Sequence, residues 1–131
     1  MIFLDTSGIF ALVSSRDPFH GVAGAKFPAQ EQFVLHNYVW AELVPLAHAR
    51  GVPVIRMLDA VSGLLSGKGV ACDWVDRQTH ERAVSLLRNR SDKSYSLCDA
   101  VSFVLMRDQG ITEALTTDEH FEQEGFVRLL K

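Results

Sequence analysis

Two aspartates stand directly after short apolar segments, in positions that suit catalysis. Asp5 follows Ile2–Leu4, and Asp118 follows Ala114–Thr117. Both segments are predicted to be buried strands that end in turns. In open α/β sheets ligands bind outside the carboxyl ends of the strands, so both carboxylates are expected to face that crevice. The alternative is that each aspartate only caps the helix that follows it.

A third carboxylate, Asp99, lies three residues after Ser96, a spacing that is typical of a capping box at the start of a helix. The helix that follows is apolar nearly all round, which indicates that it is buried. No basic residue precedes Arg107 in this helix. A buried carboxylate without a cationic neighbour needs another partner, and a metal ion would serve.

Glu42 is the only charged residue between Asn37 and Pro45, a stretch that is otherwise apolar or aromatic. A glutamate with so few polar neighbours is more often paired or bound to a metal than free. A solvated helix face is the alternative.

Together, the four acids predict a centre for a divalent cation. Carboxylates about 4 Å apart repel one another by roughly 4 kcal/mol at an effective dielectric constant near 20. A cation relieves this repulsion, and an all-oxygen ligand set suits Mg²⁺ or Mn²⁺. We expect Asp5, Asp99 and Asp118 to hold one ion, while Glu42 completes the site or holds a second. Such a centre can activate water, and it can stabilise charge on a phosphoryl oxygen. Thr6 and Thr117 are candidates for orienting the aspartates, or are simple turn and cap residues.

Strands and helices are predicted to alternate along the chain, which indicates an α/β fold with a parallel sheet covered on both faces. The predicted strands are 2–4, 33–35, 70–72, 114–117 and 126–130. The predicted helices end at Val13, run from 17 toward 30, span 37–50, 53–66 and 76–89, and begin at Ser96. Pro45 falls inside one of them and predicts a kink or break between Ala41 and Pro45, because proline removes a backbone hydrogen bond.

The composition fits one globular domain over residues 1–131, with 47% hydrophobic and 22% charged residues. The net charge of −3 provides no broad basic surface for nucleic acid. If RNA is the substrate, local cations must steer it, and Arg88, Arg90 and Lys93 before the Asp99 helix are the first candidates.

Cys72 and Cys98 lack metal-ligand spacing and are expected to be reduced thiols. Without a signal peptide or an apolar run of about 20 residues, a cytoplasmic location is expected.

The motifs around the four acids resemble those of the PIN-domain family, in the same order along nearly the whole chain. The matching segments are Ile2–Ser7, Trp40–Leu43, Ser96–Ala100 and Thr116–Phe121. The resemblance implies a three-layer α/β/α sandwich with a short parallel sheet, and a metal-dependent ribonuclease specific for single strands. His120 could by its chemistry assist as an acid or base, but the resemblance makes it a packing or capping residue. Pro45 departs from the leucine-rich pattern usual after the glutamate.

Many PIN proteins of this length are VapC-type toxins of toxin–antitoxin pairs. These are typically homodimers, and a small antitoxin inhibits them by placing its C-terminal segment in the active-site groove. The resemblance therefore implies RNA, an antitoxin and a second copy of the chain as partners. The apolar helix 54–65 would suit a dimer interface, or would be an ordinary core helix.

Several other functions compete with this interpretation. A haloacid-dehalogenase-type phosphatase requires a second aspartate two residues after the first, where this chain has Ser7. A response-regulator receiver requires an acidic pair before its aspartate and a late lysine, and neither is visible. Within the PIN family, the alternatives are a stand-alone nuclease of RNA processing and a catalytically inactive module that binds RNA or protein.

Overall fold

A parallel sheet forms the centre of the computed structural model, which describes residues 1–28 and 30–131. Five strands lie in the order β3-β2-β1-β4-β5, and every neighbouring pair is parallel. Their bounds are Ile2–Leu4 for β1, Phe33–His36 for β2, Val70–Asp73 for β3, Glu113–Leu115 for β4 and Val127–Arg128 for β5. The central strands β1 and β2 are buried along their whole length, as parallel strands covered on both faces must be.

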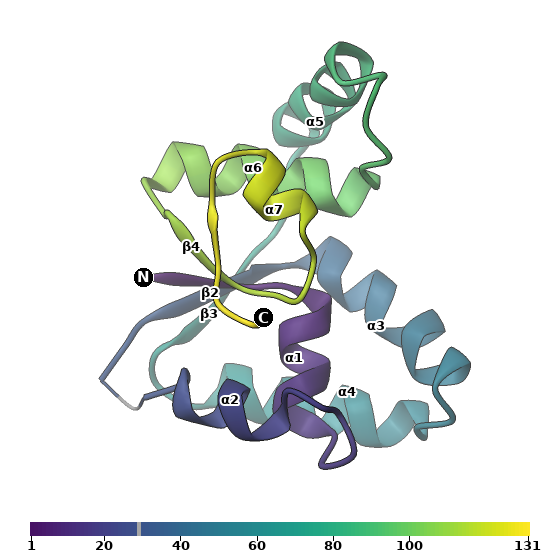
Figure 1. Ribbon diagram of the computed structural model, residues 1–131, viewed down its shortest axis with the longest axis vertical. Helices are drawn as coiled ribbons and strands as arrows, with labels where there is room; N and C mark the ends of the chain where they lie inside the picture. The colour runs from purple at the N-terminus through teal and green to yellow at the C-terminus, as the bar shows by residue number, and fades with distance from the viewer. Residues whose placement is uncertain (29) are drawn as a thin grey trace.

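Helices cover both faces of the sheet. Their bounds are Thr6–Val13 for α1, His20–Ala25 for α2, Asn37–Ala49 for α3, Val54–Ser66 for α4, Arg77–Asn89 for α5, Leu97–Gln109 for α6 and His120–Gln123 for α7. Helices α1, α2 and α4 lie on one side of the sheet and α5, α6 and α7 on the other, while α3 extends from the carboxyl edge of the strands (Figure 1). The expected three-layer α/β/α sandwich is therefore confirmed.

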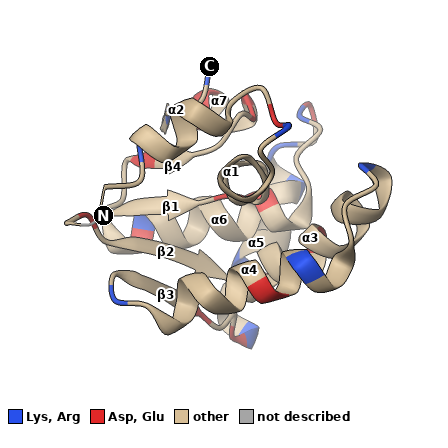
Figure 2. Ribbon diagram, turned by 90° about the horizontal axis from the view of Figure 1, so that it is seen from below, with Lys and Arg blue, Asp and Glu red and all other residues tan. Residues whose placement is uncertain are grey.

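The direction of the chain explains these layers. From β1 through β2 to β3 the chain moves toward one edge of the sheet, and from β4 to β5 it moves toward the other. Crossovers between parallel strands are right-handed, so reversing the direction moves the connecting helices to the opposite face. Charges of both signs are scattered over the helices and loops (Figure 2), in keeping with the small net charge. No helix among residues 1–28 and 30–131 is long and apolar enough to cross a membrane.

Some predicted boundaries are wrong. The helix expected from 17 toward 30 covers only His20–Ala25, and Ala29 lies outside the described residues. The exposed Gly21 and Gly24 make this segment a poor helix, because glycine is about 1 kcal/mol less favourable than alanine there. The two late strands are also shorter than predicted. Strand β4 ends at Leu115, because Thr116 and Thr117 turn toward the site, and β5 covers only Val127–Arg128.

Pro45 does not break its helix, because α3 runs from Asn37 to Ala49 with Pro45 inside it. The predicted break between Ala41 and Pro45 is therefore wrong, and the alternative, a kink, stays a prediction. Ala41 and Pro45 are both exposed, so water can reach the Ala41 carbonyl that the proline leaves without its usual partner. This relieves the cost that a buried proline would impose and keeps Glu42 within a continuous helix.

Gly8 permits close contact between α1 and β4, and we expect its substitution by alanine to destabilise the protein strongly. A Cβ atom at this position would lie 1.9 Å from the carbonyl oxygen of Leu115, a backbone atom. We expect Gly8→Ala to lower the free energy of unfolding by about 3 kcal/mol or more, because α1 would be forced away from the sheet. Urea unfolding would measure this.

Gly63 in α4 provides the matched control, since a Cβ atom there would meet nothing within 4 Å. Gly63→Ala is expected to stabilise the protein by about 0.5–1 kcal/mol through helix propensity. Equal effects of the two substitutions would contradict the tight contact between α1 and β4.

Candidate active site

Asp5 and Asp118 are brought together by the topology of the sheet. Strands β1 and β4 are neighbours, although about 110 residues separate them, and the strand order reverses between them. Asp5 follows β1, and its backbone N–H donates to the carbonyl of Leu115 at 3.3 Å. Asp118 follows β4 by a short turn. Both aspartates therefore lie at the point where open α/β sheets bind their ligands, as predicted.

Asp5 is buried in the site and has a strongly shifted pKa. It is only 5% exposed, and its Oδ2 atom accepts a hydrogen bond from the Thr116 hydroxyl at 2.7 Å. Burial raises the pKa of Asp5 to about 7, and the negative charges of Asp99 and Glu42 also raise it, while the Thr116 hydrogen bond lowers it. A carboxylate in this setting is expected to favour a bound cation.

Asp99 both caps its helix and faces the other acids. Its N–H donates to the Ser96 hydroxyl, and its Oδ2 accepts from the Ser96 N–H, each at 3.0 Å. Burial raises the pKa of Asp99, and the nearby Asp118 and Glu42 contribute to the rise. The capping box and the functional interpretation are thus compatible, because one oxygen can serve the cap while the carboxylate contributes charge to the site.

Glu42 reaches the cluster from α3. Its side chain is half-buried, and its Oε1 atom accepts a hydrogen bond from the Thr6 hydroxyl at 2.8 Å. The ring of His36 caps α3 by accepting from the N–H of Tyr38 at 3.2 Å. Glu42 is therefore fixed both by the start of its own helix and by the first residue of α1.

His120 lies between two of the aspartates. Its Nδ1 atom is 3.3 Å from Asp99 Oδ2 and 3.4 Å from Asp118 Oδ1. One ligand atom from each of these three residues lies within 4.8 Å of the others, a spacing that could hold a metal ion. His120 was expected to pack or cap. Its backbone N–H does donate to Asp118 Oδ1 at 2.9 Å, as a capping residue would. Its ring, however, also lines the cavity with the acids.

All four acids line one cavity of about 590 Å³ at the carboxyl edge of the sheet. The other lining residues are Thr6, Ser7, Pro45, Leu46, Arg50, Ser94, Ser96, Thr117 and His120. Two other cavities lie elsewhere on the protein, and neither is lined by these acids. Because catalysis depends on the groups present, the cavity with the acids is the candidate active site.

The hydroxyl groups that orient the site differ in part from the prediction. Thr6 does hold an acid, but it contacts Glu42 instead of an aspartate. Thr117 does not orient an aspartate through its side chain, because its hydrogen bonds among the described residues involve only its backbone. Thr116, one residue earlier, donates to Asp5 and accepts from the Asp118 N–H at 3.0 Å. Ser7 joins this group through its contact with Thr116 at 3.2 Å.

Thr116→Val is expected to lower cleavage of RNA by about 10–100-fold, the usual cost of losing a group that orients a metal ligand. The substitution keeps the shape of the side chain and leaves Asp5 without its shortest hydrogen bond. Thr112→Val, at an exposed position just before β4, is the control and should cleave like the wild type. Initial rates would test this, and equal activity of all three proteins would contradict the role of Thr116.

The predicted RNA-steering cations do not lie in this cavity. Arg90 is engaged with the buried carboxylate of Glu124 at 2.7 Å, and Lys93 lies 3.8 Å from Asp92. Arg88 is exposed on α5 and, like the other two, is not among the residues that line the cavity. The prediction of Arg88, Arg90 and Lys93 as an RNA contact at the site is therefore not supported. Arg50, which no sequence motif indicates, does line the cavity.

The donor set of the site fits a divalent cation of the Mg²⁺ or Mn²⁺ type. Asp5, Asp99, Asp118 and Glu42 supply oxygen atoms, and no described cysteine side chain lines the cavity. The negative charges of neighbouring acids contribute to the raised pKa values of both Asp5 and Asp99. This mutual repulsion is the electrostatic condition that a bound cation relieves.

Comparison with known proteins identifies the family to which this chain belongs. The PIN domain family matches residues 2–126. The chain belongs to the PIN-domain family. It is 32% identical over 130 residues to the 23S rRNA-specific endonuclease VapC20 of Mycobacterium tuberculosis, in strains CDC 1551 and H37Rv, covering 98% of each chain. The crystal structure of VapC20, described as a sarcin-ricin loop cleaving toxin, matches with a TM-score of 0.87 and 29% identity over the full length of both chains. The family resemblance found in the motifs is confirmed, and the PIN fold places all four motif acids around one cavity.

Proposed function

We propose that this PIN-domain protein is a metal-dependent endoribonuclease. The observation that carries the proposal is the convergence of Asp5, Glu42, Asp99 and Asp118 on one cavity at the carboxyl edge of the sheet. These residues would hold Mg²⁺ or Mn²⁺, which supplies activation of water and stabilisation of charge on a phosphoryl oxygen. Thr116 and Thr6 orient Asp5 and Glu42, and the capping box holds Asp99 in the first turn of α6.

We propose RNA of the large ribosomal subunit as the first substrate to test. The relatives at 32% identity are endonucleases specific for 23S rRNA, and the related crystal structure is that of a toxin that cleaves the sarcin-ricin loop. Ser94, Ser96 and Thr117 add polar groups to the lining of the cavity, beside the four acids. Hydrolysis by water would leave 5′-phosphate and 3′-hydroxyl ends.

We also propose that the protein is the toxin of a VapBC-type pair, held inactive by an antitoxin and forming a homodimer. The similarity to VapC20 over the full chain supports the toxin role. Helix α4 buries Met57 and Val61 but leaves Ile55 71% exposed, so an apolar side chain remains available for a second copy. Size-exclusion chromatography with light scattering would test the dimer, and Ile55→Glu should weaken it.

Mapping of cleavage ends would test the proposed substrate and reaction together. Purified ribosomes and protein-free ribosomal RNA would be incubated with the protein and Mg²⁺ or Mn²⁺, and new 5′ ends would be sequenced. A single dominant cut with a 5′-phosphate supports the proposal. Cyclic-phosphate ends would indicate attack by the 2′-hydroxyl of the RNA, and binding of RNA without any cut would favour an inactive PIN module.

A further inference from the structure

A second cavity, of about 450 Å³, adjoins the acidic one and has the opposite charge. It lies between the loop after α1 and the connection from α3 to α4. Its charged lining residues are Arg16, Asp17, Arg50 and Arg56. Three arginines against one aspartate make this a basic pocket on a protein whose overall net charge is −3.

Arg50 connects the two cavities, because it lines both. On α1, Thr6 and Ser7 line the acidic cavity and Phe10 lines the basic one, so these lining residues are about one helical turn, or about 5.4 Å, apart along the helix. A strand of RNA leaving the acids along α1 would therefore reach the arginines directly.

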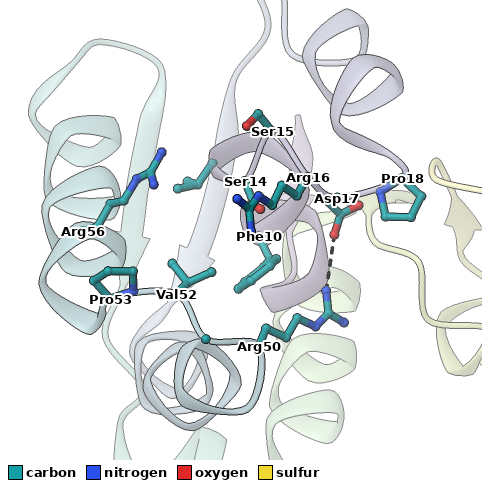
Figure 3. A pocket seen from close by; sticks show the side chains of 12 residues that line it. Phe10, Ser14, Ser15, Arg16, Asp17, Pro18, Arg50, Val52, Pro53 and Arg56 are labelled. Carbon is teal, nitrogen blue, oxygen red and sulfur yellow. Dashed lines mark hydrogen bonds and ion pairs between the residues drawn. The ribbon is translucent and has the colours of Figure 1, made fainter.

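Arg50 is held by contacts within the protein, whereas the side chains of Arg16 and Arg56 are available to bind an anion. The Arg50 guanidinium lies 3.3 Å from Asp17 and 4.7 Å above the ring of Phe10. Arg16 and Arg56 are exposed, and neither forms an ion pair within residues 1–28 and 30–131. Figure 3 shows the three guanidinium groups around the same hollow, brought there from the loop after α1, the end of α3 and α4.

We propose that Arg16 and Arg56 form a subsite for the phosphate backbone of RNA beside the acidic centre, with Arg50 at the junction. Arginine suits this role because its planar group binds phosphate oxygens in pairs. The pocket would supply the local attraction that a protein of net charge −3 needs to hold a polyanion against its own acids. The inference rests on the proposed ribonuclease function and assigns the path of the substrate.

Binding of a short labelled single-stranded RNA in EDTA, over a series of KCl concentrations, would test this subsite. The double variant Arg16→Gln/Arg56→Gln should bind at least about ten-fold more weakly, since hydrogen bonds to charged groups contribute strongly. The slope of log K against log salt should fall by about 0.7 for each arginine lost, the value for single strands. The control Lys68→Gln/Arg77→Gln removes two exposed charges outside both cavities and should match the wild type.

Cleavage assays separate this inference from the ribonuclease function itself. If the wild type cleaves RNA and the Arg16→Gln/Arg56→Gln variant binds with unchanged affinity and salt slope, the subsite is wrong and the nuclease stands. If the wild type neither binds nor cleaves RNA, the proposed function fails. Polyglutamate is the remaining probe: if it binds as tightly as RNA and loses affinity equally in the double variant, the pocket accepts acidic protein and the RNA subsite is overturned.

Discussion

Asp99→Asn is expected to lower the rate of RNA cleavage by about 100-fold or more while leaving the protein folded. The substitution removes one negative charge from the cluster, and with it an anionic ligand for the cation. The amide oxygen of asparagine can still accept the hydrogen bond from Ser96 N–H that completes the capping box. The loss should therefore appear in cleavage and in metal affinity, and not in the integrity of α6.

The same substitution should leave the metal-free protein at least as stable as the wild type. Burial raises the pKa of Asp99, which means that its charged form opposes folding at neutral pH. Replacing it by a neutral amide removes that penalty. Thermal unfolding in EDTA would measure the difference, and a large loss of stability would show that the residue is chiefly structural.

Asp108→Asn is the matched control, because it is the same change on the same helix. Asp108 is exposed and pairs with Arg82 at 2.6 Å, far from the acidic cavity. Cleavage should be unchanged, and the free energy of unfolding should fall by no more than about 1 kcal/mol, as for an exposed ion pair. If Asp99→Asn and Asp108→Asn cleave equally well, the assignment of Asp99 is wrong.

The metal-free protein is expected to lose stability as the pH rises from about 4 to about 7. Asp5 has a pKa of about 7 in the folded protein, against an ordinary value of 3.8. Between these pH values the unfolded chain binds fewer protons at this position than the folded one, so raising the pH favours unfolding. The loss from Asp5 is on the order of 4 kcal/mol, is complete above pH 7, and is absent below pH 4.

Two comparisons isolate the contribution of Asp5. Asp5→Asn should flatten the decline between pH 4 and pH 7, because an amide does not titrate in that range. Mg²⁺ or Mn²⁺ should stabilise the wild type at pH 8 but barely at pH 5, where the carboxyl proton competes with the cation. Urea unfolding in EDTA at several pH values would test this, and a wild-type stability that does not change over this range would contradict it.

The sequence predicts the fold and the convergence of the four acids on one cavity, because both depend on local patterns. Asp5 and Asp118 follow apolar strands, and Asp99 follows Ser96 at capping distance, so their places could be read from neighbouring residues. The alternation of strands and helices then implies which edge of the sheet they share. Longer-range contacts were harder to predict, because they depend on which residues meet across the sheet.

The orienting hydroxyls illustrate this difficulty. Thr116 and Thr117 are adjacent and identical in type, so the sequence does not distinguish the one whose side chain turns toward Asp5. The structure does so because β4 ends at Leu115 and the chain bends there. Ser7, which excludes a phosphatase of the haloacid-dehalogenase type, in fact belongs to this network.

His36 is a second example of a contact that depends on residues far apart in the sequence. The side chain is fully buried, and its Nε2 atom lies 2.8 Å from the Ser102 hydroxyl, which donates to the Cys98 carbonyl at 2.9 Å. Burial lowers the pKa of His36 to about 3, so the ring is neutral. This network ties the start of α3, which carries Glu42, to the first turn of α6. No periodicity in the sequence indicates such a contact across 66 residues.

The arginines that line the two cavities are hidden from the sequence for a similar reason. A run of cations before the Asp99 helix was a visible local pattern, but Arg90 is neutralised by Glu124 from α7's C-terminal end. Arg16, Arg50 and Arg56 come from three separate segments and form no pattern in the sequence. Only the packing of α1 against α3 and α4 brings them to one pocket.

The most direct test of the central claim is cleavage of a labelled RNA pool by the wild-type protein, in EDTA and after addition of Mg²⁺ or Mn²⁺ in excess. Four acids around one cavity predict no cleavage in EDTA and full recovery when the cation is restored. Cleavage that persists in EDTA, or no cleavage by well-folded protein with either cation, would contradict the assignment of this site as a metal-dependent ribonuclease centre.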